Sequence, residues 1–100
     1  MITIEREPTH PGEILKLEFL DEFGLTQVEL AKALNTTFRT VNEIINAKRS
    51  VSPEMALKLS KYFGTSVELW LNLQNQYDIY KVIQRKKDIL KEIQPLKVSA

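Results

Sequence analysis

Apolar side chains recur along this chain every three or four residues, which is the spacing of one face of an α-helix. The first run predicts a helix over 11–23, because Pro11 suits the first helical position and Gly24 readily takes the left-handed conformation that ends a helix. His10 before it is expected to cap or pack rather than to act as a ligand or base. The pattern leaves 1–7 open between a short strand and a loose arm. The apolar face of this helix is expected to hold Ile14, Leu15, Leu17, Phe19, Leu20 and Phe23.

The pattern over 25–49 predicts two short helices joined by a tight turn, and the rest of the chain is organised around this pair. Thr26 and Glu29 have the spacing of a capping box, in which each side chain binds the backbone N–H of the other residue. Asn35 is expected to turn the chain in the left-handed conformation, and Thr37 to cap the second helix. The apolar residues of the pair are Leu30, Ala31, Leu34, Val41, Ile44 and Ile45.

A fourth helix is expected to begin at Ser52-Pro53-Glu54, a cap followed by proline and an acidic residue, and to end at Gly64. The residues expected on its buried side are Met55, Ala56, Leu59, Tyr62 and Phe63.

The last helix is expected to cover 67–93, because no helix-breaking residue occurs before Pro95. At 1.5 Å per residue it would be about 40 Å long, more than the diameter of so small a domain. Its far half must therefore bend back or meet a second copy of the chain. The alternative is an aromatic core stripe with a frayed end. The residues assigned to a homodimer interface are Trp70, Leu73, Tyr77, Tyr80 and Ile83.

Composition supports a single all-α domain over 1–100, with 67–93 as a C-terminal helical extension. The chain has 43% hydrophobic and 27% charged residues, no cysteine and one histidine. These counts argue against disulfides and against a metal site. No apolar run approaches the roughly 18 residues that span a membrane, and no signal peptide is expected.

The second short helix would present the polar face that a DNA-reading helix-turn-helix inserts into the major groove. Arg39 is the expected base reader, since its guanidinium fits guanine O6 and N7, with a phosphate contact as the alternative. Asn42 suits adenine, and Glu43 either accepts a hydrogen bond from cytosine or pairs with Arg39. Phe38 either touches a thymine methyl group or packs back on the preceding helix. The phosphate contacts are assigned to Gln27, Thr37, Thr40, Lys48 and Arg49, and Asn46 completes the predicted DNA-binding set.

Charge is distributed unevenly, although the net charge is only +1. Residues 1–25 hold two Lys/Arg and six Asp/Glu, a balance of −4, whereas 26–64 hold six against three, or +3, and 65–100 six against four, or +2. The basic excess thus begins at the predicted DNA-reading helices, where phosphate contacts are wanted. Ordinary scatter of surface charge is the alternative.

Several separate segments carry a family resemblance. The chain opens with THPGEIL at 9–15 and closes with WLNLQ at 70–74, followed by YD at 77–78. Over 8–80 it resembles the HigA/VapI antitoxins, a branch of the phage-repressor-like (XRE) helix-turn-helix proteins. It departs from them at Ala47, where glycine is common, so that either Asn46 or Ala47 must take the left-handed turn.

The resemblance implies a compact five-helix lambda-repressor-like fold and a location in the bacterial cytosol, at the nucleoid. It implies a homodimer that binds the double-stranded operator DNA of its own operon. It also implies a HigB-like toxin partner, an mRNA-cleaving RNase that the antitoxin neutralises. The acidic first quarter then suggests a toxin-binding surface at Glu5, Glu7 and Glu13, with a merely solvated face as the alternative.

Three other functions are alternatives to this one. The first is an enzyme, but the sequence lacks the groups that catalysis would need: it has no cysteine, no Gly-rich phosphate loop and no serine beside a base. No catalytic residue, cofactor or small-molecule substrate is therefore expected. A protein-interaction module that has lost DNA binding stays open. A stand-alone XRE-family regulator without a toxin stays open as well.

Overall fold

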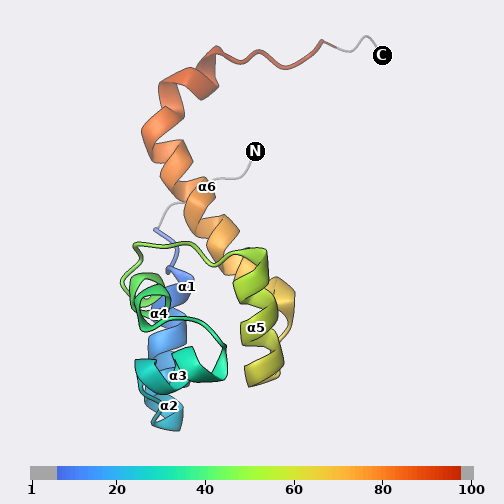
Figure 1. The fold of residues 1–100 in the computed structure, drawn as a ribbon. Coiled ribbons are helices and arrows are strands. Elements are labelled where there is room, and N and C mark those ends of the chain that lie inside the picture. The colour runs from blue at the N-terminus through green and yellow to red at the C-terminus, as the bar shows by residue number, and fades with distance from the viewer. Residues whose placement is uncertain (1–6, 98–100) are drawn as a thin grey trace.

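The structure is a computed structural model that describes residues 7–97. Five helical segments follow one another in this part of the chain, and it contains no strand (Figure 1). The prediction of an all-α fold with five helices and a long C-terminal helix is confirmed. The strand or arm expected over 1–7 lies outside the described residues, except for Glu7.

The first helical segment runs from Pro11 to Phe23 as predicted, but it is not a regular α-helix. α1 (Pro11–Ile14) passes into a π-helical stretch, η1 (Leu15–Leu20), and then into α2 (Asp21–Phe23). Hydrogen bonds in a π-helix join residues five apart, and this wider turn brings both Leu15 and Leu20 into the core. Leu17 and Phe23, which were assigned to the apolar face, are instead 51% and 62% exposed.

The next three helices are α3 (Gln27–Ala33), α4 (Phe38–Ile45) and α5 (Pro53–Phe63). Each begins directly after the Ser or Thr predicted as its cap, whose hydroxyl accepts a hydrogen bond from the backbone N–H three residues on. Gly64 ends α5 in the left-handed conformation, at φ 75°. Tyr62, expected on the buried side of α5, is 45% exposed, so that part of the prediction is wrong.

A single hydrophobic core joins these helices to the start of the last one. Trp70 is completely buried there, with its indole ring 5.2 Å from that of Phe19 and its Nε1 donating to the Thr65 hydroxyl at 2.7 Å. The assignment of Trp70 to a dimer interface is therefore wrong, because its own chain covers the side chain entirely. The core consists of Leu15, Leu20, Leu30, Ala31, Leu34, Val41, Ile44, Val51, Met55, Ala56, Leu59 and Trp70.

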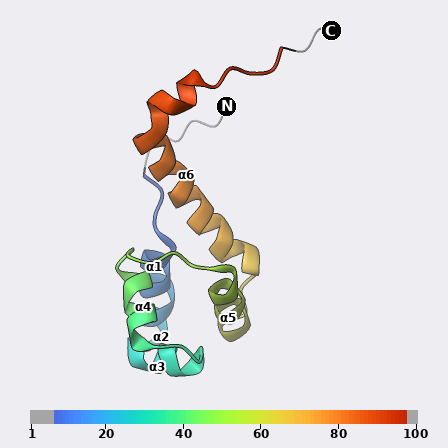
Figure 2. The same cartoon turned by 45° about the horizontal axis from the view of Figure 1, so that its top comes forward.

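The last helix, α6 (Val67–Glu92), packs on α5 with its first turns and then projects away from the body, as both ribbon views show (Figures 1 and 2). The molecule accordingly measures 56 × 26 × 21 Å. The backbone leaves helical geometry at Lys86 (φ −117°, ψ 18°), and the helix bends there without folding back on the body. No helix within 7–97 is both long and apolar enough to cross a membrane.

Several apolar side chains of the projecting half are exposed in the single chain. Of the residues predicted for a dimer interface, Leu73 and Tyr77 are half-buried against the chain's own body, and Tyr80 and Ile83 are half-buried further along. The most exposed large apolar side chains of this half are Ile79, Val82, Ile89, Leu90 and Ile93, at 43–67%.

Candidate nucleic-acid interface

The turn between α3 and α4 is fixed by backbone hydrogen bonds. The Thr36 N–H donates to the Ala31 carbonyl at 2.9 Å and the Asn35 N–H to the Lys32 carbonyl at 3.2 Å, the two bonds of a Schellman motif. Asn35 takes the predicted left-handed conformation, at φ 52°. Two of the carbonyl groups that the end of α3 leaves free, those of Ala31 and Lys32, are thereby satisfied.

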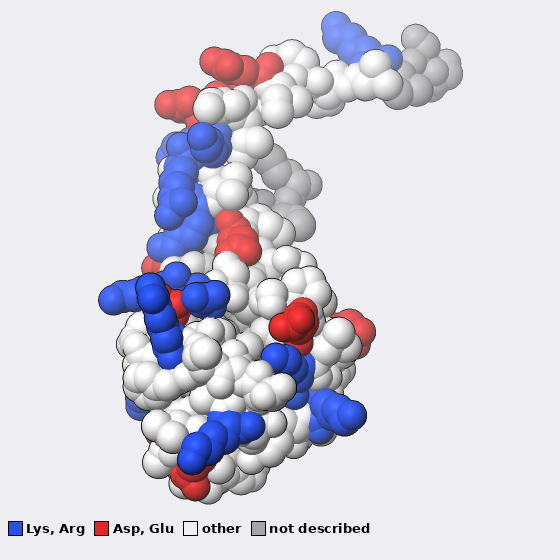
Figure 3. All heavy atoms as spheres, viewed as in Figure 1, with Lys and Arg blue, Asp and Glu red and all other residues white. Residues whose placement is uncertain are grey.

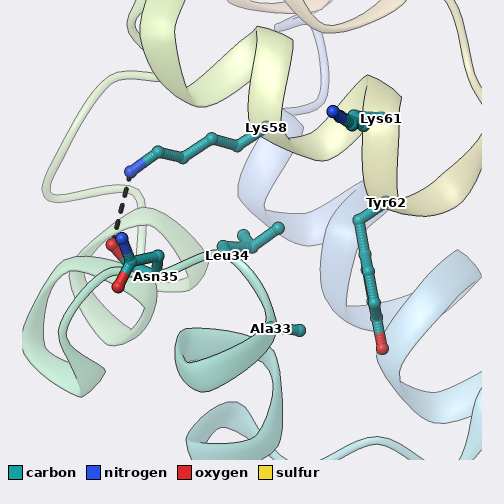
Figure 4. A pocket seen from close by; sticks show the side chains of 6 residues that line it. All are labelled: Ala33, Leu34, Asn35, Lys58, Lys61 and Tyr62. Carbon is teal, nitrogen blue, oxygen red and sulfur yellow. Dashed lines mark hydrogen bonds between the residues drawn. The ribbon is translucent and has the colours of Figure 1, made fainter.

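Helix α5 braces this turn from outside. Lys58 extends across a pocket to the turn, where its Nζ donates to the Asn35 carbonyl at 3.4 Å (Figure 4). A cation at this point also suits the negative end of the α3 dipole. The pocket is lined by Ala33, Leu34, Asn35, Lys58, Lys61 and Tyr62.

Helix α4 is capped at both ends. The Thr37 hydroxyl accepts the Thr40 N–H at 3.1 Å, as predicted. At the other end a second Schellman motif joins the Lys48 N–H to the Glu43 carbonyl at 2.8 Å. Ala47 takes the left-handed position of this motif at φ 58°, which decides between the two residues that the sequence left open.

The inner side of α4 lies directly against α1 because Gly12 has no side chain. A Cβ atom on Gly12 would fall 1.8 Å from the Ile44 carbonyl oxygen, so no larger residue fits without moving one of the two helices. His10 holds Gly12 in place, with its Nδ1 accepting the Gly12 N–H at 2.9 Å, and its ring packs edge-on against Tyr77 of α6 at 4.8 Å. The capping and packing role expected of His10 is confirmed.

A buried amide ties α6 to the loop that follows α4. Gln74 is only 4% exposed, and its Oε1 accepts the Val51 N–H at 2.8 Å while its Nε2 donates to Asp78 at 2.8 Å. The loop therefore cannot move freely relative to α6. Sequence analysis missed this contact, because an isolated glutamine within a long helix reads as a surface residue.

The ten residues predicted to bind DNA all lie on the first turn of α3, on α4 and its cap, or on the loop after α4. The side chain of Arg39 is 83% exposed, compared with 48% for Arg49 and 25% for Glu43. Phe38 is 50% exposed, so it does not pack fully against α3. The predicted residues on this continuous surface are Gln27, Thr37, Phe38, Arg39, Thr40, Asn42, Glu43, Asn46, Lys48 and Arg49.

Three amide side chains on this surface form a hydrogen-bonded row. The Asn42 Nδ2 donates to the Gln27 Oε1 at 3.0 Å, which links α4 to the first residue of α3. The Asn46 Nδ2 donates to the carbonyl and the side chain of Asn42, at 2.9 and 3.2 Å. The row holds the Asn42 amide in one orientation, as expected for a side chain that reads a flat base edge.

Glu43 accepts hydrogen bonds from two arginines of the same surface. The Arg49 Nη2 and Nε lie 2.6 and 3.0 Å from Oε1, and the Arg39 Nε lies 3.4 Å from Oε2. These hydrogen bonds, chiefly those from Arg49, hold the pKa of Glu43 below its ordinary value. The expected pairing of Glu43 with Arg39 is present, and the Arg49 contact is an addition that sequence spacing did not reveal. The alternative, a hydrogen bond accepted from cytosine, stays a prediction.

Lys and Arg side chains gather on the side of the molecule that carries α4 (Figure 3). The arrangement as a whole is a first helix, a tight turn, and a second helix held from behind with its polar face outward. This is the geometry of a helix-turn-helix, the class that reads DNA by inserting the second helix into the major groove.

Comparison with known proteins gives the family. Residues 17–70 match the helix-turn-helix family model. Antitoxin HigA-1 of Vibrio cholerae is 37% identical over 95 residues, which are 95% of this chain and 90% of that protein. The structure of Pseudomonas aeruginosa antitoxin HigA with the higBA promoter superposes with a TM-score of 0.86 at 44% identity, covering 90% of this chain and 99% of that one. Antitoxin GraA in complex with its operator gives a TM-score of 0.88 at 39% identity, covering 98% and 100%. The chain belongs to the HigA family of XRE-type helix-turn-helix antitoxins.

Proposed function

We propose that this chain binds the double-stranded operator DNA of its own operon as a homodimer and neutralises a HigB-type mRNA-cleaving toxin. The observation that carries the DNA-binding part is the outward face of α4, with an exposed Arg39 and a fixed Asn42 amide on a helix anchored from behind. The HigA and GraA structures contain promoter or operator DNA, which supports the same role here. The bacterial cytosol is the corresponding location.

The side chains of α4 divide between base and phosphate contacts. Arg39 is released from Glu43 at small cost, because the pair is exposed and exposed ion pairs contribute little. It then reads guanine, and Asn42 reads adenine while Gln27 holds its amide. In the loop after α4, Lys48 and Arg49 contact phosphates of the DNA. Thr37 and Thr40 contact phosphates at the start of α4, where backbone N–H groups of the helix also face the DNA backbone.

Dimerisation falls to the projecting half of α6. Its exposed apolar side chains form a larger apolar surface than a helix end usually leaves in water. A second copy of the same helix would cover this surface. A two-fold dimer would also present two α4 helices to the two halves of an operator.

The toxin contact is proposed from charge. A toxin that grips RNA is expected to be basic, and the first quarter of this chain has a balance of −4. Glu13 is exposed there, whereas Glu7 pairs with Lys81 at 2.7 Å and would have to exchange partners. Glu5 lies outside the described residues.

The DNA-binding proposal is tested by titrating a duplex from upstream of the chain's own gene with two variants. Arg39→Ala should lose roughly 1–3 kcal/mol of binding free energy and relax the preference for one base, whereas Lys48→Ala should weaken all sequences alike. Lys61→Ala, on α5, is the control and should change nothing. Equal and sequence-independent losses for Arg39→Ala and Lys48→Ala would reject Arg39 as a base reader.

The toxin proposal is tested by co-expression with the neighbouring gene and purification through a tag on one partner. A stable complex that suppresses mRNA cleavage is the expected result. Charge reversal at Glu7 and Glu13 should then slow association, most strongly at low salt. Sequence-specific DNA binding without any such partner would instead identify a stand-alone regulator.

A further inference from the structure

The two carboxylate oxygens of Glu43 are bound unequally. Arg49 donates to Oε1 from both Nε and Nη2, at 3.0 and 2.6 Å, whereas Oε2 accepts a longer bond from the Arg39 Nε at 3.4 Å. The Arg39 side chain is 83% exposed, so water competes for its contact with Oε2. When Arg39 leaves to contact a base, Oε1 keeps both of its hydrogen bonds and Oε2 becomes free to accept another.

The backbone on each side of Arg49 is fixed. The Lys48 N–H donates to the Glu43 carbonyl at 2.8 Å, and the Val51 N–H donates to the Gln74 Oε1 at 2.8 Å. Arg49 lies between these two contacts, in a loop that is tied to α4 at one end and to α6 at the other. Two donors on one planar guanidinium also restrict the carboxylate more than a single contact would. The Glu43 carboxylate is therefore held in place from the loop.

The chemistry of this carboxylate selects one kind of base. The hydrogen bonds from Arg49 are the main reason why the pKa of Glu43 lies below its ordinary value, so the group is ionised at neutral pH. An ionised carboxylate only accepts hydrogen bonds, and in the major groove cytosine offers a donor, its N4 amino group. Adenine sets its amino group beside the acceptor N7, which suits an amide better. The charge of Arg49 also offsets the repulsion between the carboxylate and the DNA phosphates.

Glu43 follows Arg39 by one helical turn on the outward side of α4. Side chains four residues apart on a helix have Cβ atoms about 5–6 Å from one another. Successive base pairs are about 3.4 Å apart along the duplex. The base within reach of Glu43 therefore lies within about two base pairs of the one that Arg39 contacts.

We propose that Arg49 is a positioning residue for base reading, which holds Glu43 so that its Oε2 accepts a hydrogen bond from the N4 amino group of a cytosine once Arg39 has moved to a guanine. The inference rests on the proposed function, because it takes the duplex bound by α4. Arg49 turns Nε and Nη2 to Glu43, which leaves its Nη1 for the phosphate contact. Preference at two nearby base pairs then depends on three linked side chains.

The first experiment measures the base preference of each variant. A hydroxyl-radical footprint defines a half-site in a duplex from upstream of the chain's own gene, and each of its base pairs is then replaced in turn. The wild type should prefer cytosine at one position by roughly 5- to 150-fold, and Glu43→Ala should lose that preference. Arg49→Gln should lose the same preference and also weaken binding to every duplex. Lys48→Gln removes the neighbouring charge, and it should weaken binding to every duplex while keeping the preference. A cytosine preference retained in Arg49→Gln would overturn the inference.

The second experiment tests the amino group itself. N4-methylcytosine still pairs with guanine, but a methyl group replaces the amino hydrogen that faces the major groove. The wild type should lose affinity when this base stands at the preferred position, whereas Glu43→Ala and the double variant E43A/R49Q should bind the two duplexes alike. An equal loss in the wild type and Glu43→Ala would overturn the inference, because the methyl group would then act without the carboxylate.

Two controls separate this inference from the proposed function. If the wild type does not bind the duplex, or if Arg39→Ala binds like the wild type, the proposed function fails. If Arg39→Ala loses affinity while Arg49→Gln behaves like Lys48→Gln, only the positioning role of Arg49 is rejected.

Discussion

The α3–α4 pair and the far half of α6 are both helical, but they satisfy their side chains in opposite ways. In the pair, both helices are capped at each end, and Glu43 accepts hydrogen bonds from two arginines. The apolar residues that face the core are buried there: Leu30, Ala31, Leu34, Val41 and Ile44. In the far half of α6, Ile79 and Val82 are 44% and 50% exposed, and the backbone leaves helical geometry at Lys86.

The α3–α4 pair is therefore complete within the single chain, whereas the far half of α6 requires partners. A helix whose groups are satisfied within the chain keeps its geometry before binding, so little ordering cost arises when it meets DNA. A helix with exposed apolar side chains gains from whatever covers them. The first region is thus built for recognition, and the second for assembly.

The largest expected contrast between the two regions concerns stability. Trp70→Ala, which empties the centre of the core, should lower the free energy of unfolding by about 3–5 kcal/mol. Val82→Ala on the open stripe should change it by less than about 0.5 kcal/mol in dilute solution. Urea titration followed by circular dichroism measures both. A large loss for Val82→Ala that grows with protein concentration would show that a dimer covers the stripe.

The next contrast concerns the contact behind α4. Gly12→Ala should cost about 1–3 kcal/mol of stability and also weaken DNA binding, because the added Cβ pushes against the Ile44 carbonyl. Gly24→Ala is the control: its site is left-handed at φ 65° but has open space around it, so it should cost stability without changing DNA affinity. If the two variants had the same affinity for DNA, the packing against Ile44 would not be what positions α4.

Most of the α3–α4 pair could be predicted from sequence because its signals are local. The capping box at Thr26, the turn at Asn35 and the cap at Thr37 each depend on residues within four positions of one another. The same holds for the set of residues on the outward face of α4, which follows from helical periodicity alone. Which of them touch DNA stays a prediction.

The errors arose where distant parts of the chain decide the outcome. Trp70 was placed on an open flank because periodicity cannot show that Phe19 and Thr65 cover it. Leu17 and Phe23 were placed on the buried face because a regular helix was assumed, and the π-helical turns alter that face. The role of Gly12 required the position of Ile44, which lies 32 residues further on.

A smaller effect should come from the left-handed residue that ends α4. Ala47 has φ 58°, which is strained for any residue with a Cβ, so Ala47→Gly should stabilise the fold by up to about 1 kcal/mol. Ala33→Gly, at the last regular position of α3, should instead destabilise by a similar amount. Paired urea titrations measure both. A loss of stability in Ala47→Gly would mean that the turn after α4 is not strained.

The smallest expected effect is a dependence of stability on pH through His10. Burial lowers the pKa of His10 in the folded chain, against the opposing attraction of Asp78. Protonation would also place a proton on Nδ1, which accepts the Gly12 N–H. The unfolded chain therefore takes up the proton first, near pH 6.5, so stability should be full above that pH and decline as the pH falls toward the lowered folded pKa. Unfolding titrations between pH 8 and pH 5 measure this decline. His10→Asn keeps an oxygen that can accept the Gly12 N–H but cannot be protonated in this range, so it should remove the decline while retaining the cap. Because the chain has a single histidine, a decline of the same size in His10→Asn would assign it to other groups and leave His10 as a purely structural contact.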